Sequence, residues 1–324
     1  MVVSRRRVPH RRVLAGLFFA MLALTATSSA PVWAAAAPPL RQQIVEPRPD
    51  GPGYVLTDAD LGLFAFGDVG YFGGLPIVHG DISAIDSIRS APPSFWRLTD
   101  VGEVLVMGGP GYFHGDMTTA VVTQITRGEA VALIPLPDDT GYRIVFALGD
   151  VLGFNAPALG TAFGLDLAAP IVDAAPTPSG DGYLLAAADG GVFAFGDAVF
   201  AGSLPQLLGG ATPDAPVVAI VPDLDGVGYW LIAADGGVFS FDAPFLGSVP
   251  AALGPGRELS APIVDADRYG SGYVMAGADG GVFVFGDGEW FGSVPSVLPG
   301  DVQLPSPIVG IAAFDDPSVS SSGR

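Results

Sequence analysis

One phrase recurs three times in the C-terminal half of the chain and constrains its fold more than any other feature. It runs from Gly-Tyr through Asp-Gly-Gly to Val-Phe-x-Phe, and its copies cover residues 182–197, 228–242 and 272–287. The opening tyrosines, Tyr183, Tyr229 and Tyr273, stand 46 and 44 residues apart. A fixed period of about 45 residues indicates one supersecondary unit stacked repeatedly, and a propeller blade has this size.

The copy that begins at residue 216 shows the expected strands of one unit. Residues 216–221 are a β-branched run, and residues 229–234 are apolar at nearly every position, as in a strand buried on both faces. Asp235-Gly-Gly predicts a hairpin turn that leads to a third strand over 238–241. Residues 245–249 predict a fourth, outer strand, since an aromatic-x-Gly-Ser-x-Pro segment follows each copy. In the last copy this segment begins at Phe291 and lacks the spacer residue.

The same frame extends towards the N-terminus with increasing divergence. The aromatic residues that open the second strands are Tyr54, Phe95, Tyr142, Tyr183, Tyr229 and Tyr273. Residues 306–313 repeat the first strand with no unit behind them, and residues 43–45 are a poor version of that strand. The sequence therefore predicts an all-β fold, a six-bladed β-propeller of four-stranded antiparallel blades closed by its C-terminal strand.

The N-terminal residues read as an export signal followed by one domain. Five arginines precede an apolar stretch over 13–26 that is too short to span a bilayer, and small residues follow it. The expected organisation is a signal peptide over 1–36, a linker over 37–42, the propeller over 43–313 and a flexible tail over 314–324. Ser4-Arg-Arg-Arg also resembles a twin-arginine signal, but Pro9 occupies its hydrophobic position, which favours general secretion.

Composition narrows the function classes. The chain has no cysteine and no lysine, so disulfides and thiol or amine nucleophiles are excluded. Its formal charge of −19 becomes −24 when the five signal arginines are removed, which excludes a nucleic-acid binder. No later segment is long and apolar enough to cross a membrane, so we expect a soluble, secreted and monomeric product.

The repeats resemble those of secreted actinobacterial proteins built from Gly-Tyr-Trp…Asp-Gly-Gly-Val-Phe-x-Phe-Gly-Asp-Ala units. The resemblance covers residues 43–313 and is strongest in the last three copies. It implies a β-propeller at an extracellular or envelope location, where such repeats often accompany cell-wall-acting domains. It carries no catalytic motif that transfers to this chain.

The recurring Asp-Gly-Gly turns admit two interpretations. Asp189, Asp235 and Asp279 could form a ring of ligand sites, or each could cap its hairpin and fix strand register. Repetition favours the cap, because a structural need recurs in every unit whereas a binding site does not.

Two other groups of residues have metal-ligand chemistry. Asp223-Leu-Asp225 and Asp265-Ala-Asp267 resemble fragments of calcium loops, which makes calcium the one cofactor suggested, although the complete loop pattern is absent. A plain polar turn is the alternative.

The second group comprises two His-Gly-Asp triplets. They contain His79 with Asp81 and His114 with Asp116, and both follow the outer-strand region of divergent copies. Two histidines and two aspartates would suit zinc or another divalent ion if they lay together. Ordinary Gly-Asp turns are the alternative, and His–Asp acid/base chemistry is a further one.

Some charged residues interrupt the apolar pattern. Arg97 and Arg143 are assigned the position of Trp230 in the regular repeat, so they either pair with nearby acids or face a ligand groove. First-strand acids Glu46, Asp173 and Asp265 are expected to face the central channel and attract cations there.

These features predict a secreted, non-catalytic binding or scaffold module whose ligand is an extracellular protein or an envelope polysaccharide, with the divergent first three blades as the favoured surface. The alternative is an extracellular carbohydrate hydrolase or lyase that uses two carboxylates about 5–10 Å apart on a propeller face. An aromatic platform in a concave pocket would distinguish the enzyme. A purely structural envelope protein is the third interpretation.

Overall fold

The computed structural model describes residues 51–60, 62–69, 82–88, 94–108, 114–116, 128–137, 140–298 and 304–314. The chain divides into two units, residues 1–45 and 46–324, and every described residue belongs to the second. The predicted signal peptide and linker, residues 43–46 and nearly all of the predicted tail lie outside the described residues, as do His79 and Asp81. None of the described helices is long and apolar enough to cross a membrane.

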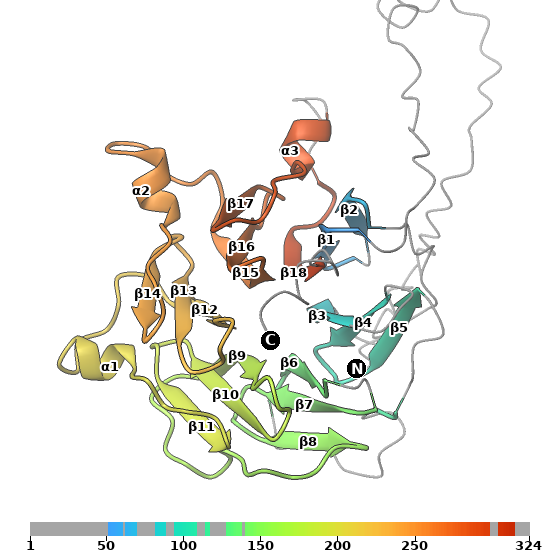
Figure 1. Ribbon diagram of the computed structural model, residues 1–324, viewed down its shortest axis with the longest axis vertical. Helices are drawn as coiled ribbons and strands as arrows, with labels where there is room; N and C mark the ends of the chain where they lie inside the picture. The colour runs from blue at the N-terminus through green and yellow to red at the C-terminus, as the bar shows by residue number, and fades with distance from the viewer. Residues whose placement is uncertain are drawn as a thin grey trace, which may run out of the picture. The chain divides into compact units, whose positions relative to one another are not determined.

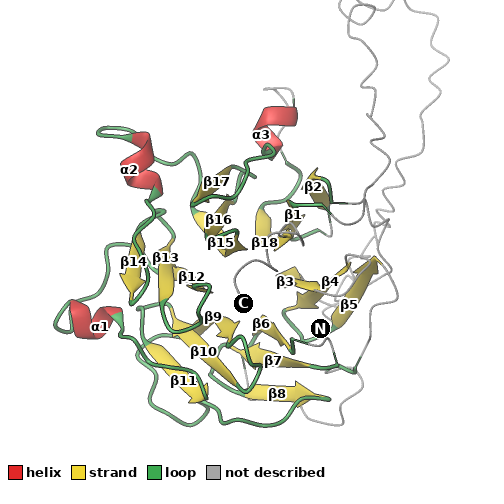
Figure 2. Ribbon diagram, in the orientation of Figure 1, coloured by secondary structure: helices red, strands yellow, loops and turns green. Residues whose placement is uncertain are grey.

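The described strands form six three-stranded antiparallel sheets, numbered here in chain order of their middle strands (Figures 1 and 2). Sheets one to three comprise β18 (Ile308–Phe314), β1 (Gly53–Asp58) and β2 (Leu63–Gly67); β3 (Ile82–Ile88), β4 (Ser94–Thr99) and β5 (Val104–Gly108); and β6 (Ala130–Pro135), β7 (Tyr142–Phe146) and β8 (Val151–Phe154). Sheets four to six comprise β9 (Ile171–Pro176), β10 (Gly182–Ala187) and β11 (Val192–Gly196); β12 (Val217–Pro222), β13 (Tyr229–Ala233) and β14 (Val238–Phe241); and β15 (Ile263–Tyr269), β16 (Gly272–Gly277) and β17 (Val282–Phe285).

The first strand of each sheet lies innermost within this unit (Figure 1). Each inner strand contacts the next in the order β3, β6, β9, β12, β15 and β18, and β18 contacts β3 in turn. The C-terminal strand β18 pairs with β1, placing Ala313 opposite Tyr54. The arrangement is that of a repeat-built β-propeller, as the period predicted.

The middle strands are buried on both faces because alternate side chains pack against different neighbouring sheets. In β13, Trp230 and Ile232 pack with residues of sheet six, whereas Leu231 packs with residues of sheet four. This double burial explains the nearly continuous apolar run that the sequence shows at residues 229–234.

The predicted fourth strand is wrong for the last three repeats. Short helices follow the third strands there: α1 (Leu204–Leu207), α2 (Val249–Leu253) and α3 (Val294–Val297). The Gly-Ser-x-Pro segment encodes a helix start rather than a strand. Each Ser is the N-cap, and Pro lies in the first turn, where a missing backbone N–H is tolerated.

The sequence alignment of the last copy also needs correction. Gly292 and Ser293 occupy the places of Gly247 and Ser248, since both serines cap the following helix. The aromatic residue equivalent to Phe245 is therefore Trp290, and no spacer residue is missing. Trp290 is 53% exposed and Phe245 is 60% exposed, which supports their equivalence.

Candidate functional site: the central cavity

The repeated tyrosines are structural, because their hydroxyls join neighbouring sheets. The Tyr229 hydroxyl donates to the carbonyl of Gly202 in the segment after sheet four. Equivalent bonds run from the tyrosine hydroxyls to glycine carbonyls in the pairs Tyr54–Gly292 (2.6 Å), Tyr142–Gly115 (2.5 Å), Tyr183–Gly160 (2.5 Å) and Tyr273–Gly247 (2.7 Å). Five of the six sheets thus carry the same inter-sheet bond, which we call the tyrosine latch; sheet two has Phe95, which has no hydroxyl.

The Asp-Gly-Gly turns are side-chain caps, as their repetition favoured. The carboxylates of Asp189, Asp235 and Asp279 each accept the backbone N–H two residues on, at 2.9 Å. The carboxylate oxygen is therefore used within its own hairpin, so we find no support for a ring of ligand sites.

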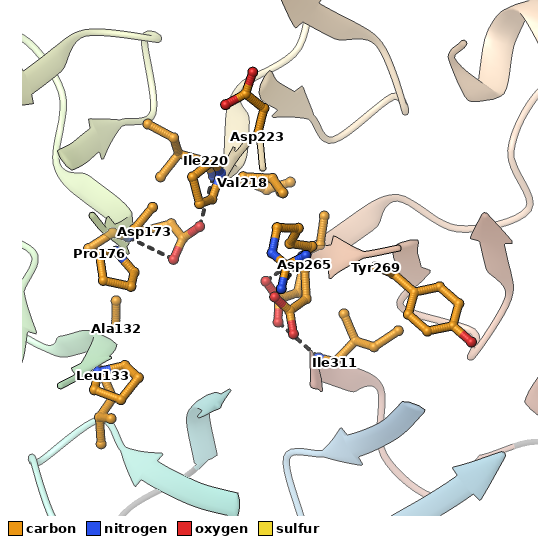
Figure 3. Close-up of a pocket in the computed structure, with 18 of the residues that line it drawn as sticks. Ala132, Leu133, Asp173, Pro176, Val218, Ile220, Asp223, Asp265, Tyr269 and Ile311 are labelled. Carbon is orange, nitrogen blue, oxygen red and sulfur yellow. Dashed lines mark hydrogen bonds between the residues drawn. The ribbon is translucent and has the colours of Figure 1, made fainter. Parts of the chain in front are cut away.

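A cavity of about 890 Å³ lies between the inner strands (Figure 3). Its walls come from β3, β6, β9, β12, β15 and β18, and its lining includes Asp173, Asp265 and Asp267. The sequence placed Asp173 and Asp265 towards the channel, and the structure confirms both. It also shows what the sequence interpretation missed: Asp267 lies two residues beyond Asp265 on the same strand, so it shares the same face.

Each of these carboxylates fastens its sheet to the next one. The Asp173 carboxylate accepts the backbone N–H of Ile220 at 2.8 Å, from the inner strand of sheet five (Figure 3). Asp265 and Asp267 accept the N–H groups of Ile311 and Ala313, at 2.9 and 2.8 Å, from β18. The second oxygen of each carboxylate accepts the N–H of the following residue. Both oxygens are therefore engaged with backbone.

The cavity wall disfavours the charged form of two of these acids. Burial raises the pKa of Asp173 to about 7, and the like charge of Asp267 adds to this effect. Burial and the neighbouring charge of Asp173 also raise the pKa of Asp265 well above its ordinary value. Both side chains keep some accessible surface because they border the cavity, but a narrow cavity solvates a charge poorly. The bonds to backbone N–H groups act in the opposite direction.

Among the charged residues of the lining, acids outnumber bases. Acidic residues of the lining are Asp173, Asp223, Asp265, Asp267, Asp287 and Glu289, whereas Arg268 is its one basic residue among those described. Tyr269 is the one aromatic residue of the described lining, and it is 2% exposed. The cavity therefore offers carboxylates and no aromatic platform within the described residues.

Arg143 occupies the position of Trp230, as the sequence predicted. Trp230 donates its indole N–H to the Pro244 carbonyl at 2.8 Å, and its ring lies 5.1 Å from that of Tyr273. The Arg143 Nε donates to the Pro157 carbonyl at 3.1 Å, and its guanidinium carbon lies 5.5 Å from the Tyr183 ring centre. Arginine thus reproduces both contacts of the tryptophan. It is 1% exposed and does not lie in a ligand groove.

Arg97 does not occupy that position. The pairing of β4 with β5 sets Trp96 opposite Val106, and this places Trp96, not Arg97, where Trp230 lies. A one-residue shift in a strand reverses the face of every side chain, so Arg97 points towards sheet one. Its guanidinium donates to the Thr57 hydroxyl and to the Asp58 carbonyl.

The environment of Arg97 is a buried charge pair. Arg97 is 0% exposed and Asp58 is 2% exposed. Burial lowers the pKa of Arg97 to about 10, and the Asp58 charge opposes this shift. Burial raises the pKa of Asp58, while the Gly62 N–H and the Arg97 charge lower it. The two charges therefore support each other at the seam between sheets one and two.

His114 and Asp116 serve the packing of the second repeat. The His114 ring lies 5.6 Å from that of Tyr142, and the Asp116 carboxylate accepts the Val104 N–H at 3.3 Å. Their proposed partners His79 and Asp81 lie outside the described residues. A divalent site there stays a prediction.

The four aspartates predicted for calcium lie in two different settings. Asp223 and Asp225 cap a turn after β12 by accepting the N–H groups of Gly226 and Val227. Asp265 and Asp267 are strand residues at the cavity wall. Within the part of the chain that the structure describes, no three His, Asp, Glu or Cys side chains are grouped to hold a metal ion. Calcium binding stays a prediction.

Comparisons with known proteins add little. No protein-family model and no curated protein matches the chain. A solved chain from "Crystal structure of Nidogen/Laminin Complex" is similar at 10% identity and a TM-score of 0.46, covering 81% of this chain and 98% of that chain. A likeness this weak shows neither activity nor partner, and the actinobacterial repeat family remains a resemblance.

Proposed function

We propose that the protein is a secreted, non-catalytic binding module, a closed six-bladed β-propeller that takes a basic side chain of a partner protein into its central cavity. The observation that carries this proposal is the lining of the cavity, where six acidic residues face one basic residue among those described. The expected setting is the extracellular space or the cell envelope.

Closure of the ring is supported by contacts at the seam between sheets six and one. Asp265 and Asp267 bond to β18, β18 pairs with β1, and Tyr54 bonds to Gly292. Residues far apart in the chain thus hold the first and last repeats together. A closed ring is the arrangement that leaves no inner strand without neighbours.

A cationic ligand fits the cavity for electrostatic reasons. Two carboxylates at the wall are poorly solvated and repel each other, so a cation placed between them would relieve both effects. Burial in a concave site strengthens the attraction compared with open water. Lysine and arginine side chains carry this charge on a stem long enough to enter a cavity.

A protein ligand fits better than a polysaccharide. Sugar-binding enzymes and modules of the kind considered above would use an aromatic platform, and the described lining offers only the buried ring of Tyr269. The hydrolase alternative retains one favourable observation, the raised pKa of Asp173, which suits a general acid. Against it, both oxygens of Asp173 accept backbone N–H groups, and these bonds favour the charged form and so oppose proton donation.

Calorimetric titration with the blocked peptide acetyl-Gly-Arg-Gly-amide tests the proposal. We expect binding that weakens with salt and weakens about tenfold or more in Asp267→Asn, which removes the charge and keeps one of the two acceptors that bond to Arg268 and Ala313. Asp235→Asn is the matched control, since Asp235 caps a turn and does not line the cavity. Equal loss in both variants, or hydrolysis of a glycan that Asp173→Asn abolishes, would reject the binding proposal.

A further inference from the structure

Among the strands that the structure describes, none pairs as a fourth strand with the outer edges of the last three sheets. β11, β14 and β17 are each hydrogen-bonded to one neighbouring strand only. An edge strand presents backbone N–H and C=O groups that can pair with another chain, and folded proteins usually cover such edges. These three edges therefore raise the question of what satisfies their backbone groups.

The register shows which groups point outwards. The Ala233 N–H donates to the Gly237 carbonyl, and hydrogen-bonded and non-hydrogen-bonded pairs alternate along an antiparallel ladder. The backbone N–H and C=O groups of Val238 and Ser240 consequently point away from β13. The Gly191 and Gly281 carbonyls accept equivalent hairpin bonds. The backbone N–H and C=O groups of Val192 and Val282 therefore point outwards in sheets four and six.

In sheet six one of these outward groups has a partner. The indole N–H of Trp290 donates to the Val282 carbonyl at 3.2 Å, as a fourth strand would. Phe245 and Phe200 occupy the equivalent places in sheets five and four and have no donor. Among the described residues, no hydrogen bond reaches the carbonyls of Val238 or Val192.

The segment that follows β14 does not fill the edge. Its Pro244 carbonyl accepts the Trp230 indole, and its Gly247 carbonyl accepts the Tyr273 hydroxyl of sheet six. These bonds direct the segment towards the next sheet rather than along β14. Phe245 remains 60% exposed and Asp242 is exposed beside the strand end.

We propose that the outer edge of β14, and by the same geometry that of β11, receives an extended basic segment of a partner protein as a fourth strand. Strand addition gives affinity through backbone hydrogen bonds, and side-chain contacts give selectivity. Exposed Phe245 offers an apolar and cation-binding ring, and Asp242 offers the complementary charge. This surface is distinct from the cavity, so the inference goes beyond the proposed function.

Charge favours a partner protein over a second copy of this chain. The full sequence carries a formal charge of −19, so two copies repel each other. Asp242, which is exposed directly after β14, repeats that sign beside the end of this strand. A basic segment meets the opposite condition.

The probe is a blocked six-residue peptide that alternates Arg and Val, titrated into the ¹⁵N-labelled protein. We expect the amides of Val238 and Ser240 to shift on binding. The matched control peptide has the same sequence with N-methyl groups on the three residues that would face β14, which removes their backbone donors. Equal affinity of the two peptides would overturn the proposal, because pure charge attraction does not need those donors.

Three substitutions at the edge sharpen the test. Phe245→Trp introduces the indole donor of sheet six and should weaken peptide binding at β14 about fivefold, roughly the effect of one competing hydrogen bond. Trp290→Phe should expose the Val282 carbonyl and add shifts in β17. Phe245→Leu, without a donor, should keep the backbone-dependent binding. Binding that survives Phe245→Trp unchanged but is lost in Asp267→Asn would place the peptide in the cavity and reject the edge.

Discussion

Sheets five and two perform the same packing task with different chemistry. In sheet five, Tyr229 supplies the latch hydroxyl, and Leu231 makes an apolar contact with the preceding sheet. In sheet two, Phe95 has no hydroxyl, and Arg97 carries a buried charge to Thr57 and Asp58. The repeat therefore preserves contacts between sheets rather than residue identities. Where the regular contact is missing, a polar one crosses the seam.

The largest effect is expected from removing the charge at the seam of sheet two. Arg97→Leu gives sheet two the leucine that sheet five has at the equivalent position, Leu231. It leaves the Asp58 carboxylate buried without its neighbouring cation. We expect a loss of about 3–5 kcal/mol in the free energy of unfolding. Chemical denaturation measures this loss. The double variant Arg97→Leu/Asp58→Ala also removes the buried carboxylate and gives sheet one an alanine, as sheet four has at the equivalent position, Ala187. It should recover part of the lost free energy of unfolding. No recovery would mean that the charge pair is not the cause of the loss.

The next effect comes from the glycine that accepts a latch bond. Gly247 has a φ of 137°, and an added Cβ would lie 2.7 Å from the Phe285 ring. Gly247→Ala should therefore cost about 2–3 kcal/mol of unfolding free energy through strain and overpacking. Gly254→Ala is the control, since Gly254 also has a positive φ, 78°, but nothing lies within 4 Å of the added Cβ. Equal costs would show that backbone strain alone, not the inter-sheet contact, matters.

The latch itself is expected to contribute less. Tyr183→Phe removes the hydroxyl that donates to Gly160 and leaves that sheet with the residue type of sheet two. We expect a loss of about 1 kcal/mol, the usual net value of one hydrogen bond. Phe95→Leu serves as the comparison, because it alters packing without touching a latch. Hydrogen exchange should show faster opening between sheets three and four, and unchanged exchange there would contradict the role of the latch.

The cavity carboxylates predict an unusual pH dependence. A folded-state pKa of Asp173 near 7, above its ordinary value of 3.8, means that the folded state binds this proton more tightly than the unfolded state. The stability from this group is fully present below about pH 4 and is lost as the pH rises through about 7. We expect the melting temperature to rise from pH 7.5 to pH 5 and Asp173→Asn to flatten that rise. A wild-type melting temperature that falls over this interval would contradict the expectation.

Metal removal should have the smallest effect. The carboxylates of Asp223 and Asp225 accept backbone N–H groups of their own turn. EDTA should therefore shift the melting temperature of the protein by less than about 1 °C. A larger fall that calcium reverses would establish the predicted calcium site. A fall that only zinc reverses would instead support the pair of His-Gly-Asp triplets.

The repeat, and with it the β-propeller architecture, could be predicted from the sequence. A period of about 45 residues, doubly apolar second strands and Asp-Gly-Gly hairpins are local signals, and local backbone chemistry decides them. The same reasoning placed Asp173 and Asp265 at the channel, because position in a repeated strand fixes the face of a side chain. The prediction of a fourth strand over residues 245–249 is wrong, because Ser248 caps a helix there and Pro250 lies in its first turn.

Which sheets the repeated residues join is visible only in the folded protein. Nothing local shows that the Tyr54 hydroxyl meets the Gly292 carbonyl, since 238 residues separate them. The face of Arg97 depended on a one-residue register that strand pairing fixes and the sequence pattern does not. The engagement of Asp173 and Asp267 with backbone N–H groups of the next sheet likewise arises between sheets. Contacts between sheets depend on how the sheets pack together, and the sequence of a single repeat does not contain this information.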